Sequence, residues 1–281
     1  LPGPHGSGSI NPPGGRCPRM GTNEIRAKAG EWPITMLTAC DAPTARLIDE
    51  AGVDIALVGD SVGNTRLGYD STLPVTVDEV ASHTAAVARA TEDALVVSDM
   101  PFLSFGANTD DAIENCGRML KEANADAVKL ECGPHTVELT RRLAEIGVPV
   151  QAHLGLTPQR ENETGLYRQG TDEESARNLL DLARRHETAG AFSLVLEHIP
   201  ANLAGAVTEA LSIPTIGIGA GPDCAGQVLV VDEATGLSER PAPVPNRFGD
   251  VRGGMQGALH DPADAAAAGA VPVQAARHPV A

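Results

Sequence analysis

Residues 34–64 read ITMLTACDAPTARLIDEAGVDIALVGDSVGN. Two short apolar runs in this stretch, ITMLT from residue 34 and IALVG from residue 55, flank a segment with the periodicity of a helix. A strand, a crossover helix and a second, parallel strand give this order of patterns. The polar pair Asp60 and Ser61 follows the second run at once. We therefore expect a strand–helix–strand unit whose second strand ends in polar side chains.

The same alternation continues as far as residue 237. Six further apolar runs are ALVVS at residue 94, AVKL at 127, VPVQAHL at 148, FSLVLE at 192, PTIGIG at 214 and QVLVV at 227. Helices are expected at residues 43–50, 77–89, 110–122, 135–146, 173–189 and 201–211, whereas the seventh crossover, AGPDCAGQ, is too short for one. Eight strands alternating with helices predict a (β/α)8 TIM barrel, with an open doubly wound sheet as the alternative.

The two ends of the chain differ in composition from this central part. The first twenty residues, LPGPHGSGSINPPGGRCPRM, contain five prolines and five glycines and show no hydrophobic periodicity. Such a segment cannot bury enough apolar surface to order itself. The proline-rich stretch RPAPVPN at residues 240–246 precedes an alanine-rich tail. We predict that residues 1–20 are disordered or foreign to the natural protein, that residues 21–265 form one catalytic barrel, and that residues 266–281 form a divergent, flexible tail.

The composition narrows the class of protein. Acidic residues outnumber basic ones by 37 to 21, and the formal net charge of −16 repels phosphate backbones, so nucleic acid is not expected as a partner. The sequence contains neither a membrane span nor a secretory signal, which predicts a soluble, cytoplasmic protein without a membrane partner. The five cysteines include no C-x-x-C pair, which favours reduced thiols. The acidic, lysine-poor composition fits adaptation to high salt or a GC-rich genome.

Polar side chains stand at the ends of most of the early apolar runs. The C-terminal ends of barrel strands meet at one mouth, where active sites lie. Each of these residues alone fits a helix cap or a loop, but their common phase favours one shared site. They are Asp60, Ser61, Asp99, Lys129, Glu131, His153 and Glu197.

Three of these side chains, Asp60, Asp99 and Glu131, are carboxylates that would repel one another at one mouth. A divalent cation among them removes the repulsion, and oxygen ligands favour Mg²⁺, which keeps water and leaves positions for substrate oxygens. No two histidines have the H-E-x-x-H spacing of a zinc enzyme. The sequence therefore predicts a magnesium site.

The remaining candidates each allow two interpretations. Lys129 shares a strand face with Glu131, two residues away, and either holds an anionic substrate group or forms a structural ion pair. His153 fits a core histidine as well as a substrate contact, and Glu197 fits acid–base chemistry as well as a plain strand end. The glycine-rich segment GIGAGPD at residues 217–223 favours close packing at the rim over a phosphate site, and His83 is expected to pack a helix.

At these residues the sequence resembles the ketopantoate hydroxymethyltransferase (3-methyl-2-oxobutanoate hydroxymethyltransferase) family. The similar blocks follow the family's order over about residues 25–240. They are the stretch quoted first, LGYDSTLPVTVDEV from residue 67, SDMPF from 98, ADAVKLE from 125, HLGLTPQ from 153, GAFSLVLEHIP from 190 and IPTIGIGAGPDCAGQVLV from 213.

The resemblance implies a barrel that uses Mg²⁺ and 5,10-methylenetetrahydrofolate to add a hydroxymethyl group to 3-methyl-2-oxobutanoate. The product is 2-dehydropantoate, the reaction passes through a Mg-stabilised enolate, and it is the first step towards pantothenate and coenzyme A. A homo-oligomer of ten subunits is implied as well, whereas the choice between a tetrahydrofolate and a methanopterin donor stays open. By the same resemblance, Asp60, Ser61, Asp99, Lys129 and His153 bind the oxo acid, Asp60, Asp99 and Glu131 form the metal site, and Glu197 accepts a proton.

The chain departs from the family pattern at its C-terminal end. The family commonly reads VLVxHD at the last strand, whereas here Val231 precedes Asp232 with no histidine between them. Two other functions therefore remain open. A magnesium-dependent carbon–carbon lyase or aldolase acting on a 2-oxo acid would share the barrel, but the cysteine loop expected of such a lyase is missing. A catalytically silent barrel is the other alternative, and the presence of all three metal carboxylates weighs against it.

Overall fold

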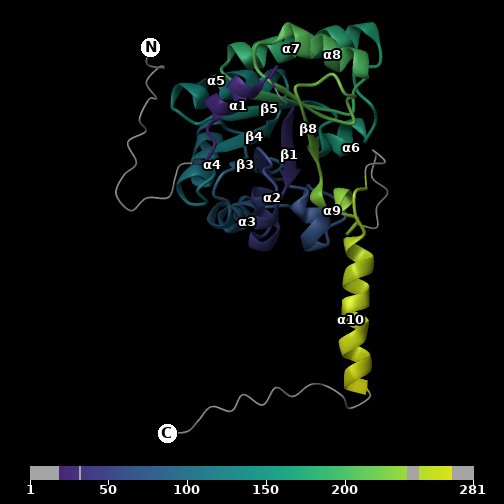
Figure 1. The fold of residues 1–281 in the computed structure, drawn as a ribbon. Helices are drawn as coiled ribbons and strands as arrows, with labels where there is room; N and C mark the ends of the chain where they lie inside the picture. Colours follow the sequence, from purple (N-terminus) through teal and green to yellow (C-terminus); the bar gives the residue numbers. More distant parts are fainter. Residues whose placement is uncertain (1–18, 32, 239–246, 268–281) are drawn as a thin grey trace, which may run out of the picture. The chain divides into compact units, whose positions relative to one another are not determined.

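The computed structural model describes residues 19–31, 33–238 and 247–267 (Figure 1). Eight parallel strands pair in chain order and close into a barrel, which confirms the predicted (β/α)8 fold. The strands are β1 Ile34–Thr38, β2 Ile55–Val58, β3 Leu95–Asp99, β4 Ala127–Glu131, β5 Val150–Gly155, β6 Ser193–Glu197, β7 Thr215–Ile218 and β8 Gly226–Leu229.

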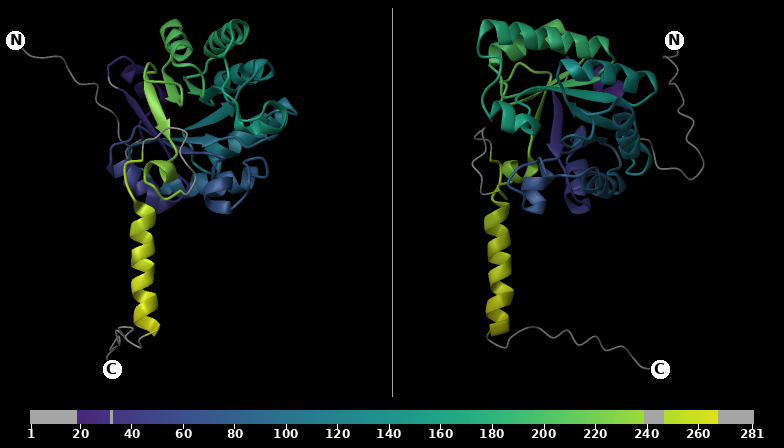
Figure 2. Two further views of the ribbon diagram at one scale, coloured as in Figure 1. Left: turned by 90° about the vertical axis from the view of Figure 1, so that its right-hand side faces the viewer. Right: turned by 180° about the vertical axis from the view of Figure 1, so that it is seen from behind.

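Helices surround the strands (Figure 2), and the six predicted helical segments are present, with bounds that differ by at most two residues. The residues that join β7 to β8 form no helix, as their number predicts. The α-helices of this part are α1 Thr22–Lys28, α2 Ala42–Glu50, α3 Val77–Ala90, α4 Thr109–Lys121, α5 Val137–Glu145, α6 Glu161–Thr164, α7 Glu173–Thr188 and α8 Ala201–Ala210. Three shorter turns are the π-helix η1 Gly63–Leu67 and the 3-10 helices η2 Pro134–Thr136 and η3 Pro158–Arg160.

Side chains of the sequence itself fix where these helices begin. Asp41 caps α2 by accepting a hydrogen bond from the Thr44 backbone N–H at 2.8 Å. Thr76 and Glu79 form a reciprocal capping box at the start of α3. Asp172 accepts the N–H groups of the first turn of α7. These caps satisfy backbone donors that a helix start leaves without a partner, so each crossover helix starts at a defined residue.

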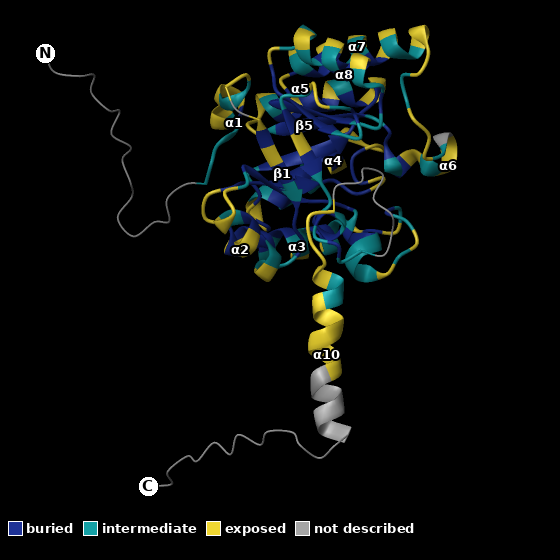
Figure 3. Ribbon diagram, turned by 45° about the vertical axis from the view of Figure 1, so that its right-hand side comes forward, coloured by how far each residue is buried: buried dark blue, intermediate teal, exposed yellow. Residues whose placement is uncertain are grey.

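The interior of the barrel is mostly apolar towards the N-terminal ends of the strands, apart from the buried hydrogen-bonded pair Gln151 and Ser193. Figure 3 shows the strands as the buried part of the barrel and the helices with one exposed side. Ile25 of α1 joins the core cluster, and Met20 packs against it. The other members of the cluster are Ile34, Met36, Ile55, Leu57, Leu95, Val97, Ala127, Phe192, Val195, Ile216 and Val228. Helix α1, which the sequence did not predict, thus contributes to the closed end of the barrel.

The ordered chain begins earlier than its composition predicts. Arg19 lies within the segment predicted to be disordered, yet its Nε is 2.7 Å from Oδ2 of Asp126. The backbone N–H of Met20 donates to the carbonyl of Asp93 at 2.8 Å. Residues 19 and 20 therefore belong to the fold, because an ion pair and a backbone hydrogen bond hold them. Residues 1–18 lie outside the described residues.

The chain divides into two compact units, residues 1–229 and 230–281. The boundary lies directly after β8. The single catalytic domain predicted from the sequence extends further, to residue 265. The second unit contains α9 Val231–Ala234 and α10 Val251–Ala267. Within it, the Phe248 N–H donates to the Ala234 carbonyl at 2.8 Å, and Arg247 pairs with Asp250. Most of the predicted tail, from residue 268 on, lies outside the described residues. No helix in the described ranges is long and apolar enough to span a membrane.

Candidate active site

The register of the barrel brings five of the predicted site residues to one end of neighbouring strands. Asp99 of β3 is the register partner of Lys129 of β4, and Glu131 of β4 is the partner of His153 of β5. Glu197 ends β6, the next strand in the barrel. Register partners in a parallel sheet point to the same face. The common phase seen in the sequence therefore corresponds to a common position at the mouth.

A line of close polar contacts crosses β3 to β6. Lys129 Nζ forms an ion pair with Asp99 Oδ1 at 2.7 Å and lies 3.4 Å from Nδ1 of His153. On the other side of the ring, His153 Nε2 lies 3.3 Å from Glu197 Oε2. Among the described residues, none is aligned to form a hydrogen bond with this Nε2. The structural ion pair considered for Lys129 is thus present, and its partner is Asp99.

Asp60 enters the same group from the loop after β2. Its backbone N–H donates to Asp99 Oδ2 at 3.4 Å, which ties the two carboxylates together. Gln159, in η3 after β5, donates from Nε2 to Asp60 Oδ2 at 2.9 Å, and its backbone N–H donates to Glu131 Oε2 at 3.0 Å. Ser61 follows Asp60 and is half-buried. One loop residue therefore positions both carboxylates.

Gln159 is the residue of this site that sequence reasoning missed. It carries no charge and lies in a loop, so neither charge nor strand periodicity marks it. Its position as the last residue of the block HLGLTPQ is the only signal in the sequence that could have identified it. The buried carbonyl of Met100 also accepts a hydrogen bond from its Nε2 at 2.9 Å, so the side chain is fixed on two sides.

Burial dominates the electrostatics of the three carboxyl groups. Asp60, Asp99 and Glu131 are each at most 6% exposed. Loss of solvent raises the pKa of all three, and the neighbouring carboxylates raise the pKa of Asp99 and Glu131 further, while Lys129 lowers all three. Ionisation of these three carboxyl groups is therefore unfavourable, and a bound cation would make it favourable.

The protonation states of Lys129 and His153 follow from their neighbours. Burial lowers the pKa of Lys129, but the carboxylates of Asp99, Glu131 and Asp60 outweigh it and raise the pKa overall. Burial lowers the pKa of His153, and the charge of Lys129 lowers it further, so the imidazole is neutral. Because the ammonium is a donor only, Nδ1 of His153 accepts and the ring proton is on Nε2, which faces Glu197.

Glu197 differs from the other carboxylates in its access to solvent. Its side chain is 23% exposed, whereas those of Asp99 and His153 are at most 3% exposed. Gly155, its register partner on β5, has φ of 101°, and a Cβ there would lie 2.2 Å from the Glu197 carbonyl oxygen. Only glycine allows this close approach. The end of β5 is therefore shaped to hold Glu197 at the rim.

The residues at the mouth fit a divalent cation in their chemistry. Asp60, Asp99 and Glu131 supply hard oxygen donors, and a bound cation would favour their ionised forms over the protonated forms that burial favours. In the described part of the chain, no group of three or more His, Cys, Asp or Glu side chains is arranged so that it could hold a metal ion. Mg²⁺ needs only one or two carboxylates when water and substrate oxygens complete its shell. The donor set thus fits Mg²⁺, and the assignment of all three carboxylates as ligands stays a prediction.

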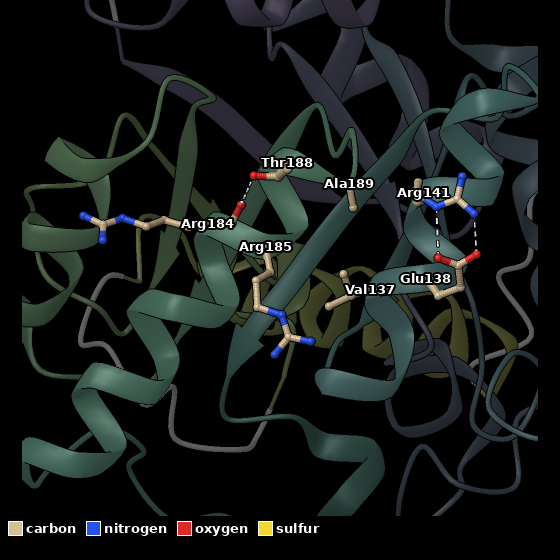
Figure 4. A pocket seen from close by; sticks show the side chains of 7 residues that line it. All are labelled: Val137, Glu138, Arg141, Arg184, Arg185, Thr188 and Ala189. Carbon is tan, nitrogen blue, oxygen red and sulfur yellow. Dashed lines mark hydrogen bonds and ion pairs between the residues drawn. The ribbon is translucent and has the colours of Figure 1, made fainter.

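Two cavities among the described residues can be compared with this site. A cleft of about 320 Å³ is lined in part by Glu131 and Gln159. A second pocket of about 290 Å³ lies between α5 and α7 (Figure 4) and contains three arginines, of which Arg141 is bonded to Glu138. None of the predicted site residues lines this second pocket. Only the first cleft adjoins the cluster at the mouth.

Other predicted features lie where the sequence placed them. His83 packs α3 against the loop after β1, with Nδ1 2.6 Å from the Cys40 carbonyl oxygen. In the glycine-rich segment, Gly221 has φ of 86°, and a Cβ there would lie 2.4 Å from that of Ala201, which is the close packing that was predicted. The four cysteines of the described ranges are free thiols.

Comparison with known proteins identifies the family. The sequence profile of the family described as ketopantoate hydroxymethyltransferase matches residues 19–274. The chain belongs to this enzyme family. It is 76% identical over 253 residues to the 3-methyl-2-oxobutanoate hydroxymethyltransferase of Natronomonas pharaonis, which covers 90% of this chain and 94% of the relative. The enzyme of the same name from Haloarcula marismortui is 62% identical over 255 residues, covering 91% and 95%.

Solved structures at low identity share the fold of the family member described here. Phosphoenolpyruvate phosphomutase from Streptomyces platensis subsp. rosaceus has a TM-score of 0.61 at 15% identity, covering 90% of this chain and 89% of that one. A phosphonopyruvate hydrolase in complex with oxalate and Mg²⁺ has a TM-score of 0.60 at 14% identity, covering 93% of both chains. At these identities the likeness extends to the barrel alone, so it carries no argument for the lyase alternative.

Proposed function

We propose that this chain is a 3-methyl-2-oxobutanoate hydroxymethyltransferase. It transfers a one-carbon unit from 5,10-methylenetetrahydrofolate to 3-methyl-2-oxobutanoate and gives 2-dehydropantoate, the first step towards pantothenate and coenzyme A. The observation that carries the proposal is the arrangement at the mouth. A buried ammonium, Lys129, stands among three buried carboxyls, and a solvent-accessible carboxylate, Glu197, lies one histidine away.

Binding of the oxo acid uses the buried charges. Lys129 is the one buried ammonium at the described mouth, so it attracts the substrate carboxylate, and the half-buried Ser61 hydroxyl is available as a further donor. Asp60 and Asp99 would hold Mg²⁺, with Glu131 as the third carboxylate of the site. When bound there, Mg²⁺ supplies positive charge for the carboxylate and keto oxygens of the substrate.

Proton removal falls to Glu197. Its carboxylate accepts the proton from C3 of the oxo acid, and the electron pair of the C–H bond moves towards the keto oxygen. The neutral His153, with its proton on Nε2, stands 3.3 Å from Glu197 Oε2, where the N–H dipole stabilises the carboxylate charge. Lys129, 3.4 Å from Nδ1, fixes the tautomer that makes this possible. Lys129, His153 and Glu197 thus form a line of polar contacts that leads from the buried ammonium to the rim of the barrel.

Carbon–carbon bond formation follows. Water releases the one-carbon unit from the donor at the oxidation level of formaldehyde: both carbon–nitrogen bonds to this carbon break, the water oxygen becomes its carbonyl oxygen, and the two water protons go to the two donor nitrogens. C3 then forms its bond to this carbon, the carbonyl π bond breaks, and the oxygen takes the proton held by Glu197, which gives the hydroxyl group and regenerates the carboxylate. Glu131 and Gln159, which belong to the oxo acid site, also line the neighbouring cleft.

We also propose the identity of the metal ion, the cellular location, the oligomeric state and the class of donor. We assign Mg²⁺ as the resident ion because hard oxygen donors dominate the site. We also propose a cytoplasmic enzyme that works as a homo-oligomer of ten subunits. The donor is either a tetrahydrofolate or a tetrahydromethanopterin, and these share a reduced pterin joined to an arylamine.

Deuterium exchange tests the proposal without the donor. Purified protein is incubated with 3-methyl-2-oxobutanoate in D₂O, with and without Mg²⁺, and the C3 proton is followed by NMR. Metal-dependent loss of the C3 signal is expected, and turnover to 2-dehydropantoate when donor is added. A folded protein that neither exchanges the proton nor forms product with either donor would refute the assignment.

A further inference from the structure

The cleft beside the mouth has a wall built from one loop. The segment after β3 supplies Phe102, Leu103 and Phe105 to its lining, followed by Gly106 and Ala107. The chain contains only four phenylalanines, and two of them line this cleft. Phe102 is 37% exposed and Leu103 is 66% exposed, so apolar surface faces solvent here. Such surface next to an active site marks a place for a ligand.

The cleft is continuous with the proposed active site. Glu131 and Gln159 line it, and the same two residues are joined by the hydrogen bond from the Gln159 N–H. Gln159 Nε2 also contacts Asp60 Oδ2. A ligand in the cleft therefore lies next to whatever occupies the group around Asp60. The cleft volume of about 320 Å³ is within the range of small-molecule sites.

The loop is held in an unfavourable conformation. Leu103 has φ of 61°, in the left-handed region that residues other than glycine rarely adopt. Between the two phenylalanines, Ser104 is 8% exposed, and its hydroxyl has no hydrogen-bond partner among the described residues. Strain and an unpartnered buried hydroxyl both cost stability, and such costs collect at ligand sites. The loop is therefore shaped for something other than its own packing.

The polar residues of the cleft define what kind of ligand fits. Arg160 and Glu163 form an ion pair with Nη2 and Oε2 2.7 Å apart, and His135 also contributes to the lining. The cleft thus combines the exposed ring of Phe102 and the mostly buried ring of Phe105 with a polar side, where the Arg160–Glu163 pair can rearrange to bind an anionic tail and N–H donors. A small branched 2-oxo acid has no flat ring to place against two phenylalanines. A reduced pterin with an arylamine and an acidic tail has flat rings, N–H donors and an anionic group.

We propose that this cleft binds the one-carbon donor, with its ring system against Phe102 and Phe105. The inference rests on the proposed function, because it takes the donor class from the reaction. It adds the residues that hold the donor and the side from which the one-carbon unit reaches the oxo acid, across Glu131 and Gln159.

Phe102→Ala tests the proposal in the full-length protein. Loss of ring stacking is expected to weaken binding of tetrahydrofolate or tetrahydromethanopterin about tenfold, measured by anaerobic titration calorimetry, and to raise the KM of the donor by a similar factor. Phe102→Tyr, which keeps the ring, should retain affinity. Phe248→Ala is the matched control, because Phe248 is 76% exposed and lies in the second unit.

The donor-free exchange reaction separates the two proposals. Phe102→Ala should keep the magnesium-dependent exchange at C3, because exchange requires only the oxo acid site. Equal loss of exchange and donor affinity, or donor affinity as in the control, would overturn the donor cleft. Binding of neither pterin by wild-type protein that still exchanges would overturn it too. Absence of exchange and turnover in the wild type would instead remove the proposed function.

Discussion

The two ends of the barrel interior are built from the same strands but contain opposite kinds of side chain. Along β3, Leu95 and Val97 belong to the apolar cluster, whereas Asp99, two residues later on the same face, is a buried carboxyl. On β4, Ala127 is followed on the same face by Lys129. On β3 and β4 the interior thus changes from apolar to charged between one inward-facing residue and the next. Stability and chemistry are assigned to different layers of one core.

This division has a physical reason. Complete burial of a leucine side chain contributes about 1.5–3 kcal/mol, so the closed end supplies net stability. Burial of Asp60, Asp99 and Glu131 acts in the opposite direction, as the raised pKa of each carboxyl shows. The barrel tolerates the buried carboxyls because burial of the apolar layer contributes more free energy than the carboxyls cost. The comparison predicts that mouth variants lose activity and closed-end variants lose stability.

Glu197→Gln should show the largest effect. The amide keeps the shape of the side chain but cannot accept the C3 proton, so kcat should fall about 10²- to 10⁴-fold. Binding of the oxo acid, measured by titration calorimetry, should change far less, and the melting temperature should stay near that of the wild type. Glu50→Gln, at an exposed position of α2, is the matched control. Equal losses in kcat and in oxo acid affinity would contradict a role in proton transfer.

Asp60→Asn should separate activity from stability most clearly. The amide oxygen can still accept from Gln159 Nε2, so the hydrogen bond is kept while one buried negative charge is removed. Metal-dependent binding of the oxo acid should fall about 10²- to 10³-fold, whereas the unfolding temperature should be unchanged or higher. Calorimetric titration with Mg²⁺ and a thermal melt measure both. Unchanged metal-dependent binding would remove Asp60 from the ligand set.

Leu95→Ala tests the apolar layer, where we expect a loss of stability without a loss of substrate binding. Leu95 is fully buried in the apolar cluster, and removal of its side chain leaves a cavity that should cost about 2–5 kcal/mol of unfolding free energy. The KM values should stay within about twofold, because the nearest site residue on β3, Asp99, is four residues away, with Val97 between them on the same face. Leu47→Ala, at a position 66% exposed on α2, should be neutral. A large change in KM with little loss of stability would mean that the two layers are not separate.

The layer structure explains how much the sequence could predict. Strands such as residues 95–99 and helices such as 77–90 follow from local periodicity, and the barrel follows from their number. The positions of Asp99, Lys129 and Glu131 follow because a charge at the end of an apolar run can only lie at a strand end. The strands, the helices and the strand-end charges can be predicted because each depends on residues close by in the sequence.

The rest depends on contacts between distant segments. Helix α1 carries no strong pattern, and its role becomes visible only when Ile25 is seen inside the apolar cluster. Gln159 is an uncharged loop residue whose importance comes from two carboxylates that lie 28 and 99 positions away in sequence. The π-helix Gly63–Leu67 is too short for a periodic signal. The two interpretations of Lys129 also needed the structure, because only the distance between its Nζ and Asp99 Oδ1 identifies Asp99 as its partner.

A buried histidine outside both layers gives a prediction for pH. His186 on α7 is fully buried, with Nδ1 3.1 Å from Thr140 Oγ1. Thr140 donates its hydroxyl proton to the Thr136 carbonyl, so Nδ1 of the histidine donates and the ring is neutral. Burial, reinforced by the charge of Arg185, lowers the pKa of His186 to about 4.

The sign of the effect follows from proton counts. Between about pH 6.5 and pH 4 the unfolded chain binds a proton at His186 that the folded chain does not, so stability should fall as pH decreases through this window. The loss should approach about 2–3 kcal/mol at pH 4. In His186→Asn, whose amide can still donate to Thr140, this part of the slope should disappear from denaturant melts. An identical slope in the variant would assign the acid sensitivity to other groups, the mouth carboxyls included.

The smallest effect is expected for Arg19→Ala, which tests how the closed end is held together. The Arg19 side chain is 9% exposed, bonds both carboxylate oxygens of Asp126, and donates to the carbonyls of Ala88 and Asn124. Its removal takes away the guanidinium donors of these acceptors, although Asp126 Oδ2 keeps the Val96 N–H, and should cost about 1–3 kcal/mol without a change in kcat. Arg177→Ala removes an exposed pair with Glu173 and should cost less than about 1 kcal/mol. If both variants melt alike, the segment before α1 does not secure Met20 against the apolar cluster, and the closed end is stabilised by strand packing alone.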